Sequence, residues 1–346
     1  MSGESVAYHL RLNKFIEREL FFELLSRLKP GVPRQDLSRY TYASMGGKFM
    51  EDLKIANHRL GIRDLFCIES DKTTFGRQLF NKPLSWIQCL QKSSDDFIND
   101  FGNLCESRNY PNFIVWLDYA AANKRGSQLT EFQSLVAQMS DFDVVKITLN
   151  ADVKTLMGRP LAPTETDEGT NVDILEKIRE EAFQRLSNQL GALMPAGFDS
   201  QRMRQDDLPN LLLEAVRIVA VKGMSGRPRS RIVPLAINKY SDGHQMLTVT
   251  AIILPVAGEH DFLERTKIAE WAFFSPDWNT IHKIHVPDLS LREKLEIDQK
   301  LGRNPIVKIH RDLPFKLHKN REASLEILQN YAVHYERYPS FGRYMT

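Results

Sequence analysis

Cysteine and long apolar runs are both scarce in this sequence. Its 346 residues include only 3 cysteines, Cys67, Cys89 and Cys105, with no Cys-x-x-Cys pair, so we expect no disulfide framework. Cys67 and Cys89 lie within apolar segments, which predicts buried thiols in a reducing compartment. No run of about 18 apolar residues occurs, which excludes a membrane-spanning helix. The N-terminal segment lacks the apolar core of a secretion signal, so we expect a cytoplasmic location.

A large excess of charge of either sign is also lacking. The chain carries 46 Lys and Arg against 44 Asp and Glu, a net charge of +2, so any contact with nucleic acid requires a local basic patch. Hydrophobic residues make up 42% of the chain, which is enough to build a core and excludes global disorder. The length corresponds to one large domain or two modest ones.

Three catalytic signatures are missing. Gly46-Gly47-Lys48 is followed by Phe49 rather than by a hydroxyl residue, so the phosphate-binding loop of an ATPase is absent. No Ser-His-Asp or Cys-His set is evident. His282 and His285 form a His-x-x-His pair, but no cysteine or acidic pattern accompanies them, and we expect no metal site.

Short apolar segments alternate with amphipathic ones through the first half of the chain. The predicted strands are Tyr40–Ser44, Asp64–Glu69, Trp86–Leu90, Asn112–Asp118 and Val144–Leu149. The predicted helices around them are Asn13–Leu28, Lys48–Leu60, Thr73–Asn81, Ser93–Phe101 and Leu129–Met139. Continuous apolar strands separated by helices are typical of a doubly wound α/β fold with a parallel sheet.

The second half of the chain departs from this alternation. Two helices, Asp173–Leu190 and Leu208–Val221, precede two strands, Arg231–Asn238 and Met246–Leu254. The link between those strands is too short for a crossover helix, so the pair must be antiparallel. Two more helices are predicted, at Leu291–Leu301 and Ala323–Tyr335. We therefore divide the chain into a helical segment (1–34), a Rossmann-like domain (35–255) with a helical insertion (152–225), and a C-terminal extension (256–346).

A glycine turn and an acid follow the first two strands. The turn after the first strand contains Ser44, Gly46 and Gly47. Glycine has no side chain, so a ligand could approach the backbone there. The helix that follows could offer its free N–H groups to a carboxylate of the ligand. Glu69 ends the second strand, where an acid can accept hydrogen bonds from ribose hydroxyls. The alternatives are an ordinary turn and a solvent-facing acid.

Acids also follow the third and fourth strands. Asp95 and Asp96, with Phe97 next, belong to a Ser-Ser-Asp-Asp run that is equally typical of a helix N-terminus. Asp118 and Tyr119 end the fourth strand, at the edge where open α/β sheets bind ligands. Asp118 can orient a nucleophile, act as a weak base or make a structural hydrogen bond.

Five parallel strands closed by a hairpin resemble the class I S-adenosylmethionine-dependent methyltransferases, over residues 35–255. The resemblance implies S-adenosylmethionine as cofactor, an adenine contact from Asp95 or Asp96 with an apolar neighbour on the ring, and an acceptor beside Asp118 and Tyr119. The usual Gly-x-Gly-x-Gly spacing and the Asp/Asn-Pro-Pro-aromatic motif of amino-methylating members are absent. A fainter similarity is to methyltransferase-like proteins of the three-Cys-motif-partner type.

Cations gather at three places. Arg11, Lys14 and Arg18, in and after the segment Tyr8–Lys14, are candidates for binding an anionic ligand or substrate, or form a solvated face. A second group comprises Lys222, Arg227, Arg229 and Arg231. The third comprises His310, Arg311, Lys316, His318, Lys319 and Arg321, with Phe315 among them. Basic residues mixed with aromatics can grip phosphates and stack on bases, so nucleic acid is a candidate partner.

Two other functions remain open from the sequence. The chain could be a catalytically degenerate Rossmann-like module that binds a partner in a nucleic-acid or phage-defence complex. It could also be an NAD-dependent oxidoreductase, but the missing third glycine and the antiparallel hairpin oppose that interpretation.

Overall fold

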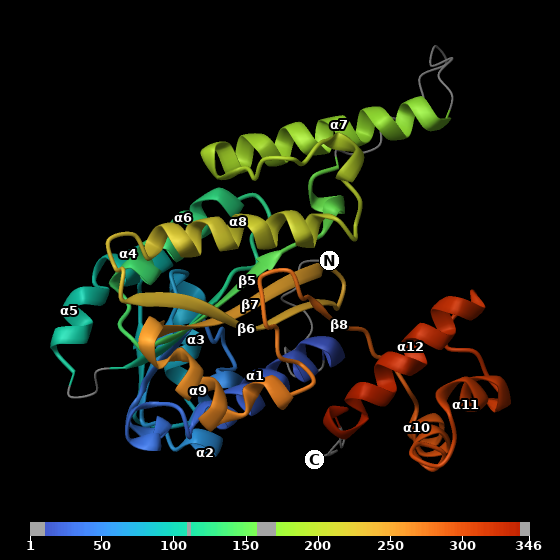
Figure 1. Cartoon of the computed structure of the whole chain (residues 1–346), viewed down its shortest axis with the longest axis horizontal. Coiled ribbons are helices and arrows are strands. Elements are labelled where there is room, and N and C mark those ends of the chain that lie inside the picture. Colours follow the sequence, from blue (N-terminus) through green and yellow to red (C-terminus); the bar gives the residue numbers. More distant parts are fainter. Residues whose placement is uncertain (1–10, 109–111, 158–170, 340–346) are drawn as a thin grey trace. The chain divides into compact units, whose positions relative to one another are not determined.

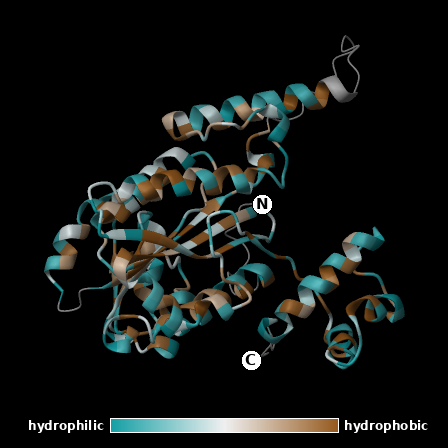
Figure 2. Cartoon of the chain, viewed as in Figure 1, coloured by the Kyte–Doolittle hydropathy of each residue, from teal (hydrophilic) through white to brown (hydrophobic). Residues whose placement is uncertain are grey.

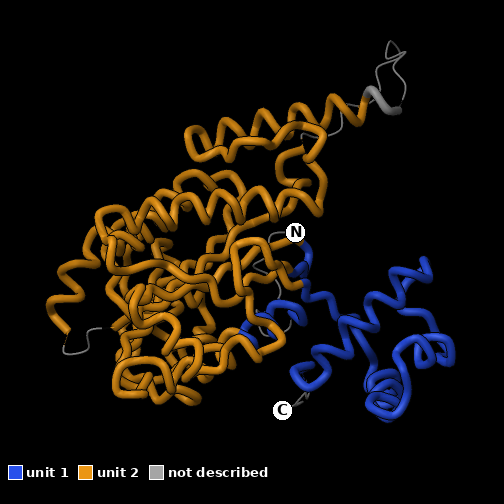
Figure 3. Tube along the Cα trace, viewed as in Figure 1, with its two compact units in different colours: residues 1–20, 240–243, 283–346 blue, residues 21–239, 244–282 orange. Residues whose placement is uncertain are grey.

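The computed structural model describes residues 11–108, 112–157 and 171–339. It divides into two compact units, distinguished by colour in Figure 3. The larger unit comprises residues 21–239 and 244–282, and the smaller one comprises residues 1–20, 240–243 and 283–346. The division at residues 34 and 255 stays a prediction.

A single sheet organises the fold, in the strand order β3-β2-β1-β4-β5-β7-β6-β8. Its strands are β1 (Thr41–Ser44), β2 (Asp64–Ile68), β3 (Ile87–Leu90), β4 (Phe113–Asp118), β5 (Val144–Asn150), β6 (Ser230–Ser241), β7 (Gln245–Pro255) and β8 (His282–Ile284). Strands β1 to β5 pair in parallel, whereas β7 pairs with β5 in the antiparallel sense. β6 neighbours β7 and is joined to it by only residues 242–244, which requires an antiparallel hairpin. The predicted fold class is confirmed.

Helices cover both faces of the parallel strands (Figure 1). In the first part of the chain these are α1 (Leu12–Leu28), α2 (Glu51–Leu60), α3 (Lys72–Asn81), α4 (Ser94–Asn99), α5 (Phe101–Glu106) and α6 (Arg125–Gln138). The later helices are α7 (Asn171–Leu190), α8 (Leu208–Gly223), α9 (Glu259–Thr266), α10 (Leu291–Asp298), α11 (Ile306–Asp312) and α12 (Arg321–His334). The helices predicted from the sequence are all present, and α5, α9 and α11 are additional short ones.

Alternate residues of β4 supply the two faces. Phe113, Val115 and Leu117 belong to a large apolar cluster that includes residues of α4, α6 and α8. Trp116 points the other way, and its ring centroid lies 5.4 Å from that of Phe21 in α1. Figure 2 shows hydrophobic residues concentrated along the central strands of the larger unit. Burial on both faces explains why β4 reads as a continuous apolar run.

A lysine interrupts the apolar pattern of β5. Lys146 is completely buried, and its Nζ lies 3.7 Å from the Trp116 ring centroid and 4.1 Å from that of Phe21. The two aromatic rings offer their negative faces to the ammonium group, which partly compensates its loss of hydration. A lysine can therefore occupy the centre of a buried strand without breaking the sheet.

Helix α2 begins later than the sequence predicted. Met50 precedes Glu51 in the left-handed conformation, with φ 49° and ψ 38°. A non-glycine residue in this region interrupts the helix that was expected to start at Lys48. The residues from Met45 to Met50 thus form a loop rather than a helical first turn.

The smaller unit is organised around the start of α1. Both carboxylate oxygens of Asp242 accept hydrogen bonds there, from the backbone N–H groups of Asn13 (3.2 Å) and Lys14 (2.7 Å). The Asn13 side chain donates to the Ser241 carbonyl (2.9 Å), and its Oδ1 accepts from the Val286 N–H (2.9 Å). Asp242 acts as a helix cap supplied from outside the helix, which satisfies donors that the helix cannot pair itself.

None of the helices in the described ranges is both long and apolar enough to span a membrane.

Helix α6 meets α7 so closely that only glycine fits at residue 126. A Cβ atom there would lie 2.0 Å from the Gln189 carbonyl oxygen. Gly126→Ala should therefore lower the free energy of unfolding by at least about 2 kcal/mol, because the two helices must separate. Gly76→Ala in α3 is the matched control: no atom lies within 4 Å of its Cβ position, and alanine there should stabilise the helix by about 0.5–1 kcal/mol. Urea unfolding of both variants checks this, and equal effects would contradict the packing described.

Candidate active site

The carboxyl ends of β1 to β5 lie at one edge of the sheet, and β7 begins at the same edge. Ser44 of β1 pairs in register with Cys67 of β2 and Trp116 of β4, so Glu69 and Asp118 each lie two residues further along their strands. The parallel pairing therefore brings the residues expected to hold the cofactor and face the acceptor to a common edge, where open α/β sheets bind ligands.

The glycine turn after β1 is shaped first by internal packing. A Cβ at Gly46 would lie 2.6 Å from Leu53 Cδ1 and 3.2 Å from the Cα of Met50. Glycine at residue 46 thus leaves room for the close approach of α2, a reason that the sequence did not reveal. Gly47 has φ +51°, which favours glycine for conformational reasons.

Helix α3 holds this turn in place. The Gln78 side chain donates to the Gly47 carbonyl (3.1 Å), and Asn81, one helical turn later, donates to the Lys48 carbonyl (3.1 Å). Gln78 is completely buried, and Ser44 is 1% exposed. Yet Gln78 Oε1 and Ser44 Oγ have no hydrogen-bond partner among the described residues. Buried polar atoms are almost always satisfied, so a water molecule or a polar group of a ligand would complete their hydrogen bonding.

The first turn of α2 differs from the expected anion site. It carries Glu51 and Asp52, and the Asp52 carboxylate accepts a hydrogen bond from the Tyr42 hydroxyl (2.9 Å). Two acids already complement the positive end of the helix dipole, which disfavours a ligand carboxylate at this helix terminus.

Glu69 lies half-buried just beyond β2. Its Oε1 accepts a hydrogen bond from the Asp71 backbone N–H (2.8 Å), and its own N–H donates to the Leu90 carbonyl (3.0 Å). These contacts fix the acid at the carboxyl edge of the sheet.

The acids after β3 are largely used to begin α4. Asp96 and Ser93 form a capping box, in which Ser93 Oγ donates to Asp96 Oδ2 (2.6 Å) and accepts from the Asp96 N–H (3.0 Å). These hydrogen bonds lower the pKa of Asp96. Asp95 is exposed and accepts from the Asn99 side chain (3.2 Å). Phe97 is buried, with its ring centroid 5.9 Å from that of Phe101, so it does not offer a face to an adenine ring.

Asp118 and Tyr119 have different surroundings. Asp118 is half-buried at the end of β4, in register with Thr148 of β5. Tyr119 is buried, and its hydroxyl donates to Glu131 of α6 (2.5 Å). Burial, with the Glu131 charge, raises the pKa of Tyr119 well above its usual value. The phenol therefore stays protonated and links the strand end to α6.

The three N-terminal cations belong to the smaller unit. Lys14 and Arg18 are 6% and 4% exposed, so they do not form the solvated face considered above, and Arg11 is half-buried. Tyr8 to Leu10 lie outside the described residues.

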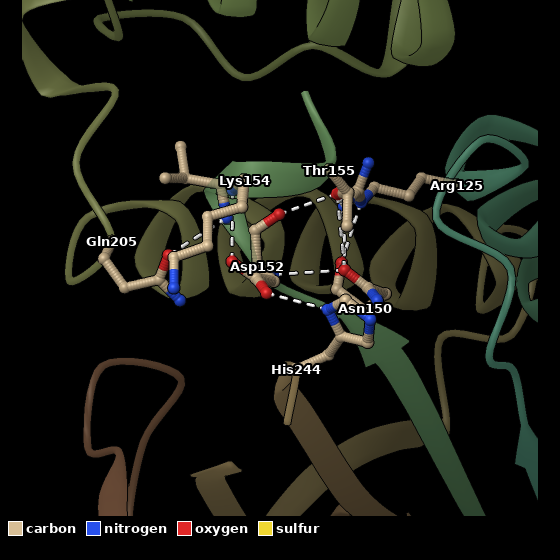
Figure 4. Close-up of polar contacts among 8 residues, drawn as sticks. Arg125, Asn150, Asp152, Lys154, Thr155, Gln205 and His244 are labelled. Carbon is tan, nitrogen blue, oxygen red and sulfur yellow. Dashed lines mark hydrogen bonds and ion pairs between the residues drawn. The ribbon is translucent and has the colours of Figure 1, made fainter. Parts of the chain in front are cut away.

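A polar network at the end of β5 was missed by the sequence analysis (Figure 4). The Arg125 side chain is completely buried and uses all its N–H donors, with the Asn150 carbonyl (2.7 Å), Asn150 Oδ1 (3.1 Å), Thr155 Oγ1 (2.7 Å), Gln189 Oε1 (3.0 Å) and the Ala122 carbonyl. Burial lowers the pKa of Arg125 to about 10, opposed by the nearby Asp152 charge, so it remains a cation.

The network continues to a histidine at the start of β7. The Asp152 N–H donates to Asn150 Oδ1 (3.1 Å), and Asp152 Oδ2 lies 2.8 Å from His244 Nδ1. Asp152 and His244 are distant in sequence, but the pairing of Asn150 with Met246 brings them together. The signal available in the sequence was the antiparallel hairpin. Its second strand, β7, runs opposite to β5, so the start of β7 lies beside the end of β5.

A family model described as "Putative O-methyltransferase" matches residues 6–346. The chain belongs to this family. The expected methyltransferase membership is thereby confirmed, whereas the three-Cys-motif-partner similarity stays a prediction. No curated protein matches the chain.

Solved structures similar to this chain include methyltransferases that share little sequence identity with it. One is the plantazolicin methyltransferase BpumL in complex with a pentazolic desmethylPZN analog and SAH (TM-score 0.39, 11% identity, covering 69% of this chain and 85% of that chain). Another is the N-methyltransferase NodS from Bradyrhizobium japonicum WM9 (TM-score 0.35, 11% identity, covering 69% of this chain and 97% of that chain). A third is the O-methyltransferase TomG from Streptomyces achromogenes in complex with SAM (TM-score 0.33, 12% identity, covering 69% of this chain and 79% of that chain).

One buried carboxyl group with a raised pKa lies away from the carboxyl edge of the sheet. Burial raises the pKa of Asp143 to about 7, against hydrogen bonds from the Phe113 N–H (2.7 Å) and the Ser140 N–H (2.7 Å). Asp143 precedes β5 and thus lies at the amino edge of the sheet, where it fixes the strand starts. In the part of the chain that the structure describes, no cluster of His, Cys, Asp or Glu is arranged to hold a metal ion.

Substitutions in the Arg125 network should destabilise the fold more than substitutions elsewhere at the carboxyl edge of the sheet. Arg125→Lys leaves carbonyl and amide oxygens unpaired in a buried site, so the free energy of unfolding should fall by about 3 kcal/mol or more. Arg217→Lys is the control, because Arg217 pairs with Glu214 on the half-exposed face of α8 and should change little. Urea unfolding compares them, and a small effect at residue 125 would contradict the role given to the guanidinium.

Proposed function

We propose that this chain transfers the methyl group of S-adenosylmethionine to an oxygen atom of its acceptor. One observation carries the donor assignment: two buried, unpartnered polar atoms, Ser44 Oγ and Gln78 Oε1, flank the glycine turn after β1, while Glu69 ends the neighbouring strand. Membership in a family described as O-methyltransferases supports the reaction and the acceptor atom.

The residues at this edge fit an adenosine-containing donor. Ser44, Gly46, Gly47 and Gln78 would meet its amino-acid portion, and Glu69 would accept hydrogen bonds from the ribose hydroxyls. Because Asp96 is engaged in the α4 capping box, Asp95 is the better candidate for the adenine amino group. Asp118 would face the acceptor, and Tyr119 would support it through α6.

For methyl transfer, the main contribution of the protein is to align the donor with the acceptor. When bound, the donor supplies an electrophilic methyl group on a sulfonium. The side chains named above hold donor and acceptor in line, which can account for much of the acceleration in a displacement of this kind.

We propose that the acceptor is a nucleic acid, because the smaller unit has an exposed basic surface. Its exposed cations between α10 and α12 are Arg303, Lys308, Arg311, Lys316, Lys319 and Arg321, with Asp312 as the only acid in that stretch. The sequence also suggested Arg11, Lys14 and Arg18 of the same unit as substrate-binding cations, but Lys14 and Arg18 are 6% and 4% exposed and are therefore less suited to binding phosphates. The group near β6 is less suitable, since Arg227 donates to the Met139 carbonyl (2.6 Å) and Arg231 pairs with Glu259.

Calorimetry with S-adenosylmethionine tests the donor assignment. Glu69→Ala should weaken binding by about 10-fold or more, because a charged hydrogen-bond acceptor is lost. Glu264→Ala on α9, an exposed acid, should leave the affinity unchanged. NAD and ATP should give no heat. An unchanged affinity in the Glu69 variant would refute its role, and the absence of heat with every ligand would favour a binding module without catalysis.

Fluorescence anisotropy with a labelled single-stranded RNA tests the basic surface. The variant Lys316→Gln/Lys319→Gln/Arg321→Gln should bind at least about 10-fold more weakly, and the slope of log K against log salt should fall in magnitude by about 2. Lys177→Gln/Lys267→Gln, which removes two exposed cations of the larger unit, is the control. Equal affinity of the triple variant and the unaltered protein would contradict the nucleic-acid assignment.

A further inference from the structure

Asp152 and His244 form a pair in which the carboxylate is buried and the imidazole is exposed. Asp152 is 2% exposed, whereas 62% of the His244 side chain is accessible to solvent. Asp152 Oδ2 lies 2.8 Å from His244 Nδ1, and Asp152 Oδ1 accepts from the Lys154 N–H (3.1 Å). A carboxylate that accepts from Nδ1–H fixes the neutral tautomer in which Nε2 has a lone pair available to bind a proton.

The surroundings hold this pair in one geometry. Asn150 Oδ1 receives both the Asp152 N–H and an Arg125 N–H, so the carboxylate is tied to the buried guanidinium (Figure 4). On the other side, Gln205 accepts from the Val153 N–H (3.2 Å) through Oε1 and from the Gln245 side chain (2.9 Å) through its carbonyl. His244 therefore emerges from a segment that is fixed on both sides, as a proton-transfer group requires.

The pair also lies at the edge of the sheet where the acceptor is expected. β5 is the only strand between β4, which ends at Asp118, and β7, whose start follows His244. Arg125 joins the loop after β4 to the same network through the Ala122 carbonyl. The strand end assigned to the acceptor and the exposed imidazole thus share one supporting framework.

We propose that His244 is the general base that removes the proton from an acceptor hydroxyl, that Asp152 is its positioning residue, and that the hydroxyl is a ribose hydroxyl of RNA. This inference rests on the proposed function. Among nucleic acids, hydroxyl groups along the chain occur in RNA and not in DNA. A hydroxyl must lose its proton when it is methylated and therefore needs a base.

The step balances as follows. The acceptor oxygen forms a bond to the methyl carbon while the bond from that carbon to sulfur breaks, and the sulfur keeps the electron pair as a neutral thioether. The O–H proton moves to His244 Nε2 and then to water. The Asp152 carboxylate stabilises the transient imidazolium through the contact to Nδ1. A positioned general base contributes about 10²–10⁴-fold to such a step.

The test measures transfer of a labelled methyl group from S-adenosylmethionine to single-stranded RNA and to DNA of the same sequence. The unaltered protein should methylate RNA only, and the product should resist alkaline cleavage at the modified position. His244→Ala should lower kcat by about 100-fold or more while the donor Kd stays within about 2-fold. Added imidazole should restore part of the rate, which no structural role of His244 would allow. His260→Ala is the matched control, because His260 forms an exposed pair with Glu264 (3.7 Å) on α9.

Each alternative outcome is distinguishable. Failure of the unaltered protein to bind the donor overturns the proposed function itself. Donor binding without methylation of RNA, or methylation of DNA as well, overturns the assignment of a ribose hydroxyl. An active His244→Ala variant, or one that imidazole does not rescue, overturns the role of His244. Asp152→Asn should lower kcat by at least about 10-fold with the donor Kd preserved, and an unchanged kcat would remove Asp152 from the mechanism.

Discussion

Parallel pairing of five strands is the constraint on which the functional edge depends. Because β1 to β5 all run in one direction, their carboxyl ends coincide, and side chains far apart in the sequence become neighbours. The hairpin adds a second consequence. β7 runs the other way, so its beginning rather than its end joins this edge, and His244 arrives beside Asp152. Reversing either direction would separate the groups assigned to donor, acceptor and base.

Two kinds of polar atom at this edge have opposite roles. The Arg125 guanidinium is fully hydrogen-bonded, so it rigidifies the loop after β4 and the end of β5 without any need for a ligand. Ser44 Oγ and Gln78 Oε1 are buried without partners in the described structure. The hydrogen-bonded groups thus form a supporting framework, and the two unsatisfied atoms are where we propose that the donor binds. The left-handed backbone at Met50, next to the turn, is a strain of the sort that collects at functional loops.

The sequence predicted the fold better than the site, for physical reasons. Strands such as Phe113–Asp118 are buried on both faces, so their apolar runs are visible without any tertiary information. Helices α9 and α11 are short and carry few buried apolar residues, so periodicity was too weak to reveal them. Gly46 was recognised as special, but the close approach of Leu53 to it is a tertiary contact. Asn150 and Asp152 are near neighbours in the chain, but only the register between β5 and β7 brings His244 to them.

A crystal structure of the chain with S-adenosylhomocysteine tests the central claim most directly. The account predicts that the ribose lies against Glu69, that the amino-acid portion satisfies Ser44 Oγ and Gln78 Oε1, and that the sulfur faces the end of β4. Ligand bound elsewhere on the larger unit, or the same two polar atoms left unpaired beside a bound ligand, would contradict it.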